Sequence, residues 1–496
     1  MSTTASPQNG ASNGPEHTPV PTPKKKLQGR QFYESIGSPK YVVAPMVDRS
    51  EFAWRMLTRS FMSPDEKKQI LAYSPMYHAR LFGEQAKMRS QFFQPTRGSA
   101  AGEGNRDEKR KDELYLDGNP LFDRPLFVQF CANDPNEFLE AARHVAPYCD
   151  AEDWDLIYRL INKLHTELSV PVTAKFRIQE TKEKTLEYAK MILSAGANII
   201  TVHGRRREQK GHETGLADWS YIRYLRDNLP PDTVIFANGN ILNYDDLERC
   251  LKETGADAVM SAEGNLSDPT IFSKPPAVGS GGREYWWGRD GKGGYRIDAV
   301  LRRYYDIIYR HVLEQPIPER KPLFIPSDPV DEATEAHESE EEEGPPQKKQ
   351  KKDKHRRSNS PSLRYALARS KGGDMPAFEH VLTLVERAIK SGLLEYEANP
   401  EKFERSPDVT LTGSKATIAE YGRPWWVCQP HIRPLPEEAL VNGALTAKGS
   451  VTTAKGRKDD EPPAGSKSAA SEKPSTPANG GSETSATLTP DNLVSG

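Results

Sequence analysis

The sequence predicts an α/β fold: a (β/α)8 TIM barrel that lacks one strand and its loop, followed by a small C-terminal helical domain. The first observation is that short apolar runs alternate with helix-like segments, and strands joined by helices favour parallel pairing with right-handed crossovers. The second is that six of these runs end in clusters of polar residues. Polar residues at the carboxyl ends of successive parallel strands are typical of barrel active sites.

The strands and helices follow from this pattern in chain order. The expected strands are 41–46, 71–76, 125–130, 171–178, 198–203, 233–238 and 257–262. The expected helices are 51–61, 136–148, 152–168, 184–194, 219–229 and 244–253, with two more at 298–314 and 378–391. Each strand is a short run rich in branched or aromatic residues, and each helix has apolar residues at helical spacing.

One strand of the series is missing from this pattern. The helix at 136–148 leads directly into an amphipathic helix at 152–168, with Trp154, Leu160 and Leu164 on one face. A closed barrel of this type has eight strands. We therefore expect seven strands here and two unpaired strand edges at the gap at 150–152.

Composition indicates a soluble protein with long polar appendages. Of the 496 residues, 36% are hydrophobic and 28% are charged, and no apolar run reaches the length of a membrane span. The first twenty residues lack the pattern of a signal or transit peptide, so we expect a cytoplasmic or nuclear protein. The four cysteines, Cys131, Cys149, Cys250 and Cys428, lack metal-ligand spacing, so no metal site is expected.

The chain divides by composition into ordered and polar segments. We expect a disordered leader at 1–30, the barrel at 31–275, a helical domain at 276–326 and 363–435, a disordered insertion at 327–362 and a disordered tail at 436–496. The insertion ends in a basic block, Lys348–Arg357, which follows an acidic run. The block is typical of a nuclear import signal or a nucleic-acid patch, and a solvated charged loop is the alternative.

Two neighbouring strand ends indicate a phosphate site. Asn238, Gly239 and Asn240 follow the strand at 233–238, while Ala262 and Glu263 follow the last strand. Small residues with exposed backbone N–H groups at these positions are where such barrels most often bind a phosphate. The alternative is that each Asn-Gly pair is simply a turn.

Cationic side chains follow the two preceding strands. Lys175 and Arg177 are two residues apart and therefore lie on the same face of one strand. His203 and Arg205 are related in the same way on the next strand. Four such groups around one barrel mouth favour an anionic ligand, although a lysine paired within the barrel is the alternative for Lys175. Gln129 offers a donor and an acceptor suited to the edge of a heterocycle. The run Pro45, Met46 and Val47 gives an apolar floor.

Six motifs occur in a fixed order along the barrel. They are Ala-Pro-Met-Val-Asp-Arg-Ser-Glu (44–51), Gln-Phe-Cys-Ala-Asn-Asp (129–134), Thr-Ala-Lys-Phe-Arg (173–177), Thr-Val-His-Gly-Arg (201–205), Ala-Asn-Gly-Asn-Ile (237–241) and Ser-Ala-Glu-Gly-Asn-Leu (261–266). Together they resemble the tRNA-dihydrouridine synthases, in the eukaryotic branch that acts on neighbouring D-loop uridines. The resemblance covers about 38–275 and continues weakly through Pro424–Pro430.

The resemblance implies an FMN-binding barrel and a C-terminal helical domain that helps hold tRNA, with NADPH or NADH as reductant and tRNA as substrate and partner. Hydride from the reduced flavin would reach a uracil that has left its stack, giving 5,6-dihydrouridine. By resemblance, Pro45, Met46 and Val47 pack the isoalloxazine, Gln129 and Lys175 bond its edge, and His203 lies near flavin and uracil. Asn238, Gly239, Asn240, Ala262 and Glu263 match the phosphate end, and Arg177 and Arg205 face the uracil or the RNA.

The family's catalytic cysteine has no counterpart in this sequence. The resemblance implies a strand followed by a loop with that cysteine after Asp150–Ala151, but Glu152–Trp154 come next. Cys131 is expected to pack the barrel, so no catalytic residue is assigned. We expect a chain that is impaired as written, because it is a mis-predicted or alternatively spliced product that drops one in-frame segment. The alternatives are a tRNA- or FMN-binding pseudoenzyme and an FMN barrel that reduces a small molecule.

Overall fold

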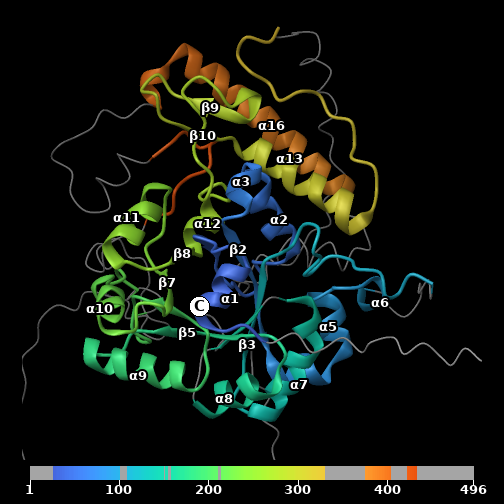
Figure 1. Ribbon diagram of the computed structural model, residues 1–496. Helices are drawn as coiled ribbons and strands as arrows, with labels where there is room; N and C mark the ends of the chain where they lie inside the picture. Colours follow the sequence, from blue (N-terminus) through green and yellow to red (C-terminus); the bar gives the residue numbers. More distant parts are fainter. Residues whose placement is uncertain are drawn as a thin grey trace, which may run out of the picture.

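Eight parallel strands close into a barrel in the computed structural model, each strand pairing with the next along the chain and β1 pairing with β8 (Figure 1). The strands are β1 (Tyr41–Val43), β2 (Ile70–His78), β3 (Leu126–Cys131), β4 (Ala151–Trp154), β5 (Val172–Arg177), β6 (Ile199–His203), β7 (Val234–Asn238) and β8 (Ala258–Ser261). The structure describes residues 26–100, 109–149, 151–154, 158–209, 214–329, 375–403 and 422–432. The barrel class is confirmed.

Helices surround the barrel, as expected for strands joined by crossovers (Figure 1). They are α1 (Gly29–Ser35), α2 (Phe52–Ser60), α3 (Pro64–Lys67), α4 (Ala79–Glu84), α5 (Ala86–Phe92), α6 (Arg97–Ala100), α7 (Pro135–Val145), α8 (Tyr158–Glu167), α9 (Lys182–Ser194), α10 (Ser220–Asn228), α11 (Asp245–Thr254) and α12 (Glu263–Ser267). Local chemistry sets their ends. Asp134 caps α7 by accepting from the N–H groups of Asn136 and Glu137, and Gly255 ends α11 with φ 67°.

The fourth strand corrects the sequence analysis. Residues Ala151–Trp154, expected to begin a helix, form β4, and the helix begins only at Tyr158. β4 pairs with β3 on one side and β5 on the other, so the expectation of two unpaired edges is wrong. The pattern of Ala-Glu-Asp-Trp gives no strand signal, and the unmet hydrogen bonds of the two neighbouring strands provide the reason for pairing.

The start of the chain also differs from expectation. α1 begins at Gly29, within the segment expected to be a disordered leader, and residues 1–25 lie outside the described part. The ammonium group of Lys26 donates to the carbonyl oxygens of His165 and Leu168 at the end of α8. Phe32 of α1 stacks on Phe127 of β3 with ring centroids 5.9 Å apart. This segment therefore belongs to the barrel.

The C-terminal part packs on α2. It contains the hairpin β9 (Tyr285–Trp287) and β10 (Gly293–Tyr295), the helix α13 (Ile297–Ile307) with its π-helical end η4 (Ile308–Leu313), and the long helix α16 (Met375–Ala398). α13 and α16 lie side by side above α2 (Figure 1). Arg302 pairs with Glu386 across them at 2.5 Å. The two expected C-terminal helices are confirmed, whereas the hairpin was not expected. The insertion from 330 and the tail lie outside the described residues.

Residues 422–432 form a segment that we call the C-terminal strap. The strap adds to the hairpin through hydrogen bonds from Cys428 N–H to Tyr295 oxygen and from Ile297 N–H to Trp426 oxygen, at 2.9 and 2.8 Å. The side-chain amide of Gln429 donates to two carbonyl oxygens of the same strap and stiffens its turn. Trp426 is fully buried against the hairpin and α16.

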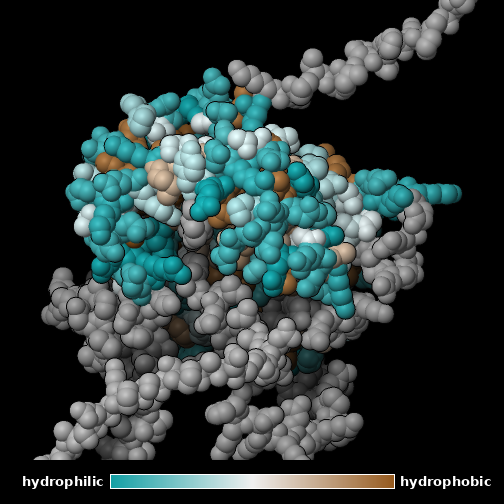
Figure 2. Space-filling model, turned by 90° about the horizontal axis from the view of Figure 1, so that it is seen from below, coloured by the Kyte–Doolittle hydropathy of each residue, from teal (hydrophilic) through white to brown (hydrophobic). Residues whose placement is uncertain are grey.

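Figure 2 shows one face of the molecule, on which hydrophilic residues predominate and hydrophobic ones are scattered. Among the described residues, the helices are all too short or too polar to cross a membrane. The same residues contain no cluster of histidine, cysteine and carboxylate side chains that could hold a metal ion.

Candidate functional site

The strand register brings five predicted site residues onto one face of the barrel wall. Arg177 of β5 pairs in register with His203 of β6, which in turn pairs with Asn238 of β7. Lys175 lies on the same face as Arg177 because side chains alternate along a strand. Gln129 of β3 is in register with Asp153 of β4, which pairs with Thr173 of β5. Thr173 lies two residues before Lys175, so Gln129 belongs to the same face. All five lie at or near the carboxyl ends of their strands, so the predicted cluster is one site.

The loop after β1 provides the apolar floor that the sequence predicts. Pro45 and Met46 are buried, whereas Val47 is 40% exposed. The hydroxyl of Ser50 accepts a hydrogen bond from the N–H of Met46 at 2.9 Å, and Asp48 takes a φ of 56° to turn the chain. An exposed valine at the barrel mouth leaves an apolar surface available to a flat ring.

A buried ionic network holds that loop in place, and the sequence analysis missed it. Arg55 of α2 donates to the carbonyl oxygen of Ser50 at 2.9 Å, to Asp123 Oδ1 at 3.0 Å and to Asp117 Oδ1 at 2.9 Å. Burial alone would raise the pKa of the Asp123 carboxyl, but the charges and hydrogen bonds of Arg55 and Arg59 bring it below its ordinary value. These partners are distant in sequence, so spacing gives no signal for them.

Arg205 lies inside the site rather than on its rim. Only 4% of its surface is exposed, and its guanidinium donates to the carbonyl oxygens of Thr214 and Gly215 and to Asn240 Oδ1. Its Nη1 also lies 3.0 Å from Nε2 of His203. Arg205 therefore joins the loops after β6 and β7. Its predicted contact with uracil or RNA stays a prediction.

The end of β7 has backbone donors suited to an anion. No described residue accepts a hydrogen bond from the backbone N–H of Gly239 or Asn240. Gly239 has a φ of 109°, and a Cβ there would lie 2.7 Å from the Cβ of Ala217, so only glycine fits this turn. The side-chain amide of Asn238 donates to the carbonyl oxygen of Met260, which fixes β7 to β8. These features suit the predicted phosphate end.

The end of β8 is more open. Ala262 is half-buried and Glu263, the first residue of α12, is exposed. The carboxylate of Glu263 lies 3.8 Å from Nε2 of His431 in the C-terminal strap. Burial and the nearby Arg205 lower the pKa of the His431 imidazole. The strap therefore reaches the barrel mouth, a contact that the sequence analysis missed.

Lys175 and Arg177 stand at the end of β5. Both are half-buried, and Arg177 donates to the carbonyl oxygens of Arg206 at 3.1 Å and Gln209 at 3.2 Å. Arg177 therefore orders the loop after β6 in addition to any contact with a ligand. Its predicted role toward RNA is not tested by these contacts.

The sequence after β4 has no thiol near the barrel mouth. It contains no cysteine between Cys149 and Cys250. Burial raises the pKa of Cys250 to about 12, and burial with the nearby Asp268 raises that of Cys428. Neither thiol is suited to acid–base work at neutral pH. The site as a whole can bind an anionic heterocycle that ends in a phosphate, but it has no candidate thiol acid after β4.

Comparison with known proteins shows which chains are similar to this one. A family model described as "Dihydrouridine synthase (Dus)" matches residues 42–153 and 149–285, and the two matches meet at 149–153. The chain is 39% identical over 434 residues to the tRNA-dihydrouridine(16/17) synthase [NAD(P)(+)] of Schizosaccharomyces pombe, covering 83% of this chain and 92% of that protein.

Two further relatives match shorter parts. The Saccharomyces cerevisiae protein of the same name is 46% identical over 306 residues, covering 57% of this chain and 64% of its own. A Mus musculus protein, "tRNA-dihydrouridine(16/17) synthase [NAD(P)(+)]-like", is 41% identical over 284 residues, covering 52% of this chain and 54% of its own.

Proposed function

The chain belongs to the dihydrouridine synthase family, and on that premise we propose that it is an NAD(P)H-dependent oxidoreductase built to reduce uridine to 5,6-dihydrouridine in the D-loop of tRNA. The observation that carries the proposal is the shared face of Gln129, Lys175, His203 and Asn238. It lies beside the N–H groups of Gly239 and Asn240, for which no described residue is the acceptor. This arrangement is suited to one flat anionic cofactor.

FMN is the cofactor that this site fits best. When bound, FMN would supply the hydride chemistry of the reaction. The N–H groups of Gly239 and Asn240 would hold its phosphate, as backbone donors commonly do at this place in a barrel. Met46 and Val47 would pack against the ring, and Lys175 would stabilise negative charge on it.

We assign His203 and Arg205 a role in positioning the cofactor and the uracil rather than in bond making or breaking. The guanidinium of Arg205 holds the imidazole of His203 and the side-chain oxygen of Asn240 at the same time. The ring of His203 therefore stays fixed beside the predicted cofactor and uracil positions. A fixed donor at a reacting ring needs no reorganisation during turnover.

The absence of a cysteine after β4 in the sequence supports impaired turnover in this chain as written. Reduction of a uracil double bond needs a hydride at one carbon and a proton at the other, and the sequence between Cys149 and Cys250 has no thiol that could deliver that proton. The second candidate function, favoured by this one feature, is a pseudoenzyme that binds tRNA or FMN without turnover.

One experiment separates these functions. The full chain would be purified with added FMN and examined for flavin absorbance, NADPH oxidation and dihydrouridine formed in an unmodified tRNA transcript, measured by mass spectrometry. Bound flavin with slow tRNA-stimulated oxidation supports the impaired synthase, and bound flavin with tRNA affinity but no product supports the pseudoenzyme. Loss of both flavin and tRNA binding refutes the proposal. Oxidation indifferent to tRNA would instead favour reduction of a small molecule.

The cellular location is also a proposal. The basic block Lys348–Arg357 lies outside the described residues, and its composition suits recognition by a nuclear import receptor. We propose a cytoplasmic and nuclear distribution. Fluorescence microscopy of the tagged chain, with and without substitution of the block by glutamines, tests this directly.

A further inference from the structure

Two exposed arginines lie on a turn beside the candidate site. Arg206 and Arg207 directly follow Arg205 on the loop after β6, and both side chains are exposed. Within the described part of the chain, no carboxylate pairs with either guanidinium. Arginine binds phosphate through two parallel hydrogen bonds, so available guanidiniums at the rim of a site suit a phosphate ligand.

The turn that carries these arginines is fixed in shape. The N–H of Gln209 donates to the carbonyl oxygen of Arg206 at 3.2 Å and closes a β-turn over 206–209. The N–H of Arg206 donates in return to the side-chain oxygen of Gln209 at 2.8 Å. Arg177 of β5 holds both ends, since its Nη1 donates to the carbonyl oxygens of Arg206 and Gln209. A ligand that binds this turn therefore meets a backbone that is already ordered, which lowers the entropy cost of binding.

The charge at the turn favours a doubly negative group. Arg177, Arg206 and Arg207 bring three guanidiniums and Glu208 brings one carboxylate, which leaves an excess of two positive charges. A phosphomonoester carries about 1.5 to 2 negative charges at neutral pH. Each phosphodiester of a nucleic acid carries only one. The turn is therefore better matched to a phosphomonoester than to an RNA backbone.

One further carboxylate lies near the turn but has its own partner. Glu180 pairs with Lys184 at 2.9 Å. This hydrogen bond, with a smaller contribution from the charge of Arg206, lowers the pKa of the Glu180 carboxyl. Because Lys184 offsets the charge of Glu180, the positive excess at the turn remains.

The phosphate of FMN does not need these two arginines. The N–H groups at the end of β7 are proposed to hold it, and Arg205 is already engaged with His203 and Asn240. Arg206 and Arg207 are therefore available to the phosphate of a second molecule at the barrel mouth.

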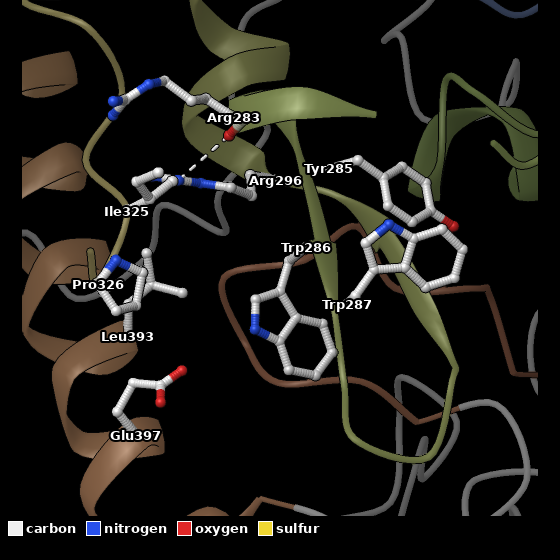
Figure 3. Close-up of a pocket in the computed structure, with 9 residues that line it drawn as sticks. All are labelled: Arg283, Tyr285, Trp286, Trp287, Arg296, Ile325, Pro326, Leu393 and Glu397. Atoms are coloured by element: carbon white, nitrogen blue, oxygen red, sulfur yellow. Dashed lines mark hydrogen bonds between the residues drawn. The ribbon is translucent and has the colours of Figure 1, made fainter. Parts of the chain in front are cut away.

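Arginines beside a pocket in the C-terminal part are not available in this way. Figure 3 shows Trp286 extending from β9 toward α16, with Arg283 and Arg296 beside it. Arg283 pairs with Asp328 and Arg296 with Asp298, each at 2.5 Å. Ion pairs within the chain already offset both cations, so that pocket gives no reason to expect a phosphate.

We propose that the turn at 206–209 binds the 2′-phosphate of NADPH, and that Arg206 and Arg207 thereby favour NADPH over NADH. The two dinucleotides differ only in this phosphomonoester, and an arginine is the usual partner of a 2′-phosphate. In this arrangement the nicotinamide lies toward His203, and the adenosine end lies toward Arg206, three residues further along the chain. The inference deepens the proposed function and rests on it, since it names the reductant that the same site takes.

The first test follows the anaerobic reduction of bound flavin by each dinucleotide in stopped flow, using the full chain loaded with FMN. Reduction of the flavin needs no thiol acid, so the absence of the family's cysteine does not affect this readout. We expect a larger second-order rate constant with NADPH than with NADH. Arg206→Gln and Arg207→Gln should each lower the NADPH/NADH ratio by about tenfold, the effect of losing one charged phosphate contact.

Calorimetry provides a readout that does not depend on flavin reduction. The probes are adenosine 2′,5′-bisphosphate and adenosine 5′-monophosphate, which lacks the 2′-phosphate. The unaltered chain should bind the bisphosphate at least about tenfold more tightly, and Arg206→Gln should lose most of this difference. Arg206→Lys keeps the charge without the two-pronged hydrogen bonding, so its preference should lie between those of the other two chains.

Arg223→Gln is the matched control. Arg223 is an exposed arginine of α10 that pairs with Asp227. Its substitution should leave the NADPH/NADH ratio and the preference between the probes within about twofold, because exposed ion pairs contribute little. FMN content, melting temperature and the Kd for an unmodified tRNA transcript are measured for every variant.

The outcomes distinguish this inference from the proposed function. A lower NADPH/NADH ratio with unchanged FMN content and tRNA affinity supports the 2′-phosphate site. An unchanged ratio in both glutamine variants overturns it, as does an unaltered chain that shows no preference for NADPH. Weaker tRNA binding with an unchanged ratio overturns it as well and assigns the arginines to RNA phosphates. If the chain binds no flavin, the proposed function fails and the inference fails with it, whereas in the other cases flavin is bound and reduced.

Discussion

The Nη1 atom of Arg205 lies 3.0 Å from Nε2 of His203, and both side chains are buried at the barrel mouth. A guanidinium has donors only, so Nε2 of His203 is the acceptor in this contact. The contact fixes the position of the imidazole ring. The same guanidinium bonds Asn240, so one side chain sets the geometry of both the ring and phosphate ends of the proposed cofactor site.

We predict that Arg205→Met weakens flavin binding by at least about tenfold, since hydrogen bonds to a charged group contribute about 1.5–3 kcal/mol. His203, Asn240 and two carbonyl groups would lose their donor. The measurement is flavin fluorescence on titration with FMN. Arg207→Gln, an exposed arginine two residues away, is the control and should bind FMN normally. Equal affinity in the two variants would contradict the assigned role.

Lys175→Ala should lower flavin retention and slow flavin reduction, because the variant loses the cation that stabilises negative charge on the ring. The comparison uses Lys184→Ala, whose ammonium is exposed on α9 and pairs with Glu180. Flavin per protein and the rate of flavin reduction by NADPH are the readouts. Unchanged occupancy and rate in Lys175→Ala would remove this residue from the site.

Asp123→Asn should destabilise the chain by about 3–5 kcal/mol at pH 7, because it leaves Arg55 buried without its main partner. The folded pKa of Asp123 is lowered, so the carboxylate stabilises the fold fully above its unfolded pKa of about 3.9. This contribution is lost as pH falls through the lower folded pKa. Urea unfolding at several pH values should show the difference between variant and wild type shrinking in acid.

The control for this experiment is Asp65→Asn. Asp65 pairs with Lys68 at 2.9 Å, but both side chains are exposed. Its substitution should leave stability unchanged at pH 7. A similar loss in both variants would mean that burial of the Arg55 network is not what stabilises the loop after β1.

Gly239→Ala should impair flavin binding more than stability. The new Cβ would lie 2.7 Å from Ala217 and press on the ring of His203. Gly279→Ala is the matched control, because it has a φ of 79° but no atom within 4 Å of the added Cβ. Both substitutions carry backbone strain, so only a difference between them reports the close contact. Equal flavin affinity in Gly239→Ala and Gly279→Ala would contradict the phosphate-binding role proposed for the backbone at Gly239.

The transcript itself provides a further prediction. Amplification across the codons for Asp150 and Glu152 should give a longer product that encodes a loop with a cysteine. When expressed, the longer chain should form dihydrouridine in tRNA at a rate at least about a hundredfold above that of the 496-residue chain. This factor is the low end of what general acid catalysis contributes. If only the short product exists, the protein should bind tRNA without turnover.

Much of the barrel could be predicted from the sequence, because seven of its strands are apolar enough to be recognised by themselves. β4 could not, since Ala151–Trp154 form a strand only through pairing with β3 and β5. The register places the predicted residues at the ends of β5, β6 and β7 side by side, while their roles in a site stay predictions. The register of parallel strands follows from the fold, so Lys175 and His203 had to lie near each other once the barrel was assumed.

The hydrogen bonds and ion pairs between buried side chains at the site could not be predicted from the sequence. The expectation that Arg205 faces the uracil or the RNA stays a prediction. Its observed partners could not be predicted, because they lie on loops whose paths depend on the folded barrel. Arg55 and Asp123 are 68 residues apart, and nothing in their spacing indicates an ion pair. The strap was likewise missed, because residues 422–432 add to a hairpin that has too few apolar residues to be predicted.

The pairing of α13 with α16 has an evolutionary consequence. The ion pair Arg302–Glu386 joins these helices, and the described part of the chain breaks off at 329 and resumes at 375. Loop-closure entropy rises by only about 0.6 kcal/mol for each doubling of loop length. Selection on stability therefore constrains the length of this connection very little. In this connection, related proteins can gain or lose charged sequence, including targeting signals, while the barrel stays unchanged.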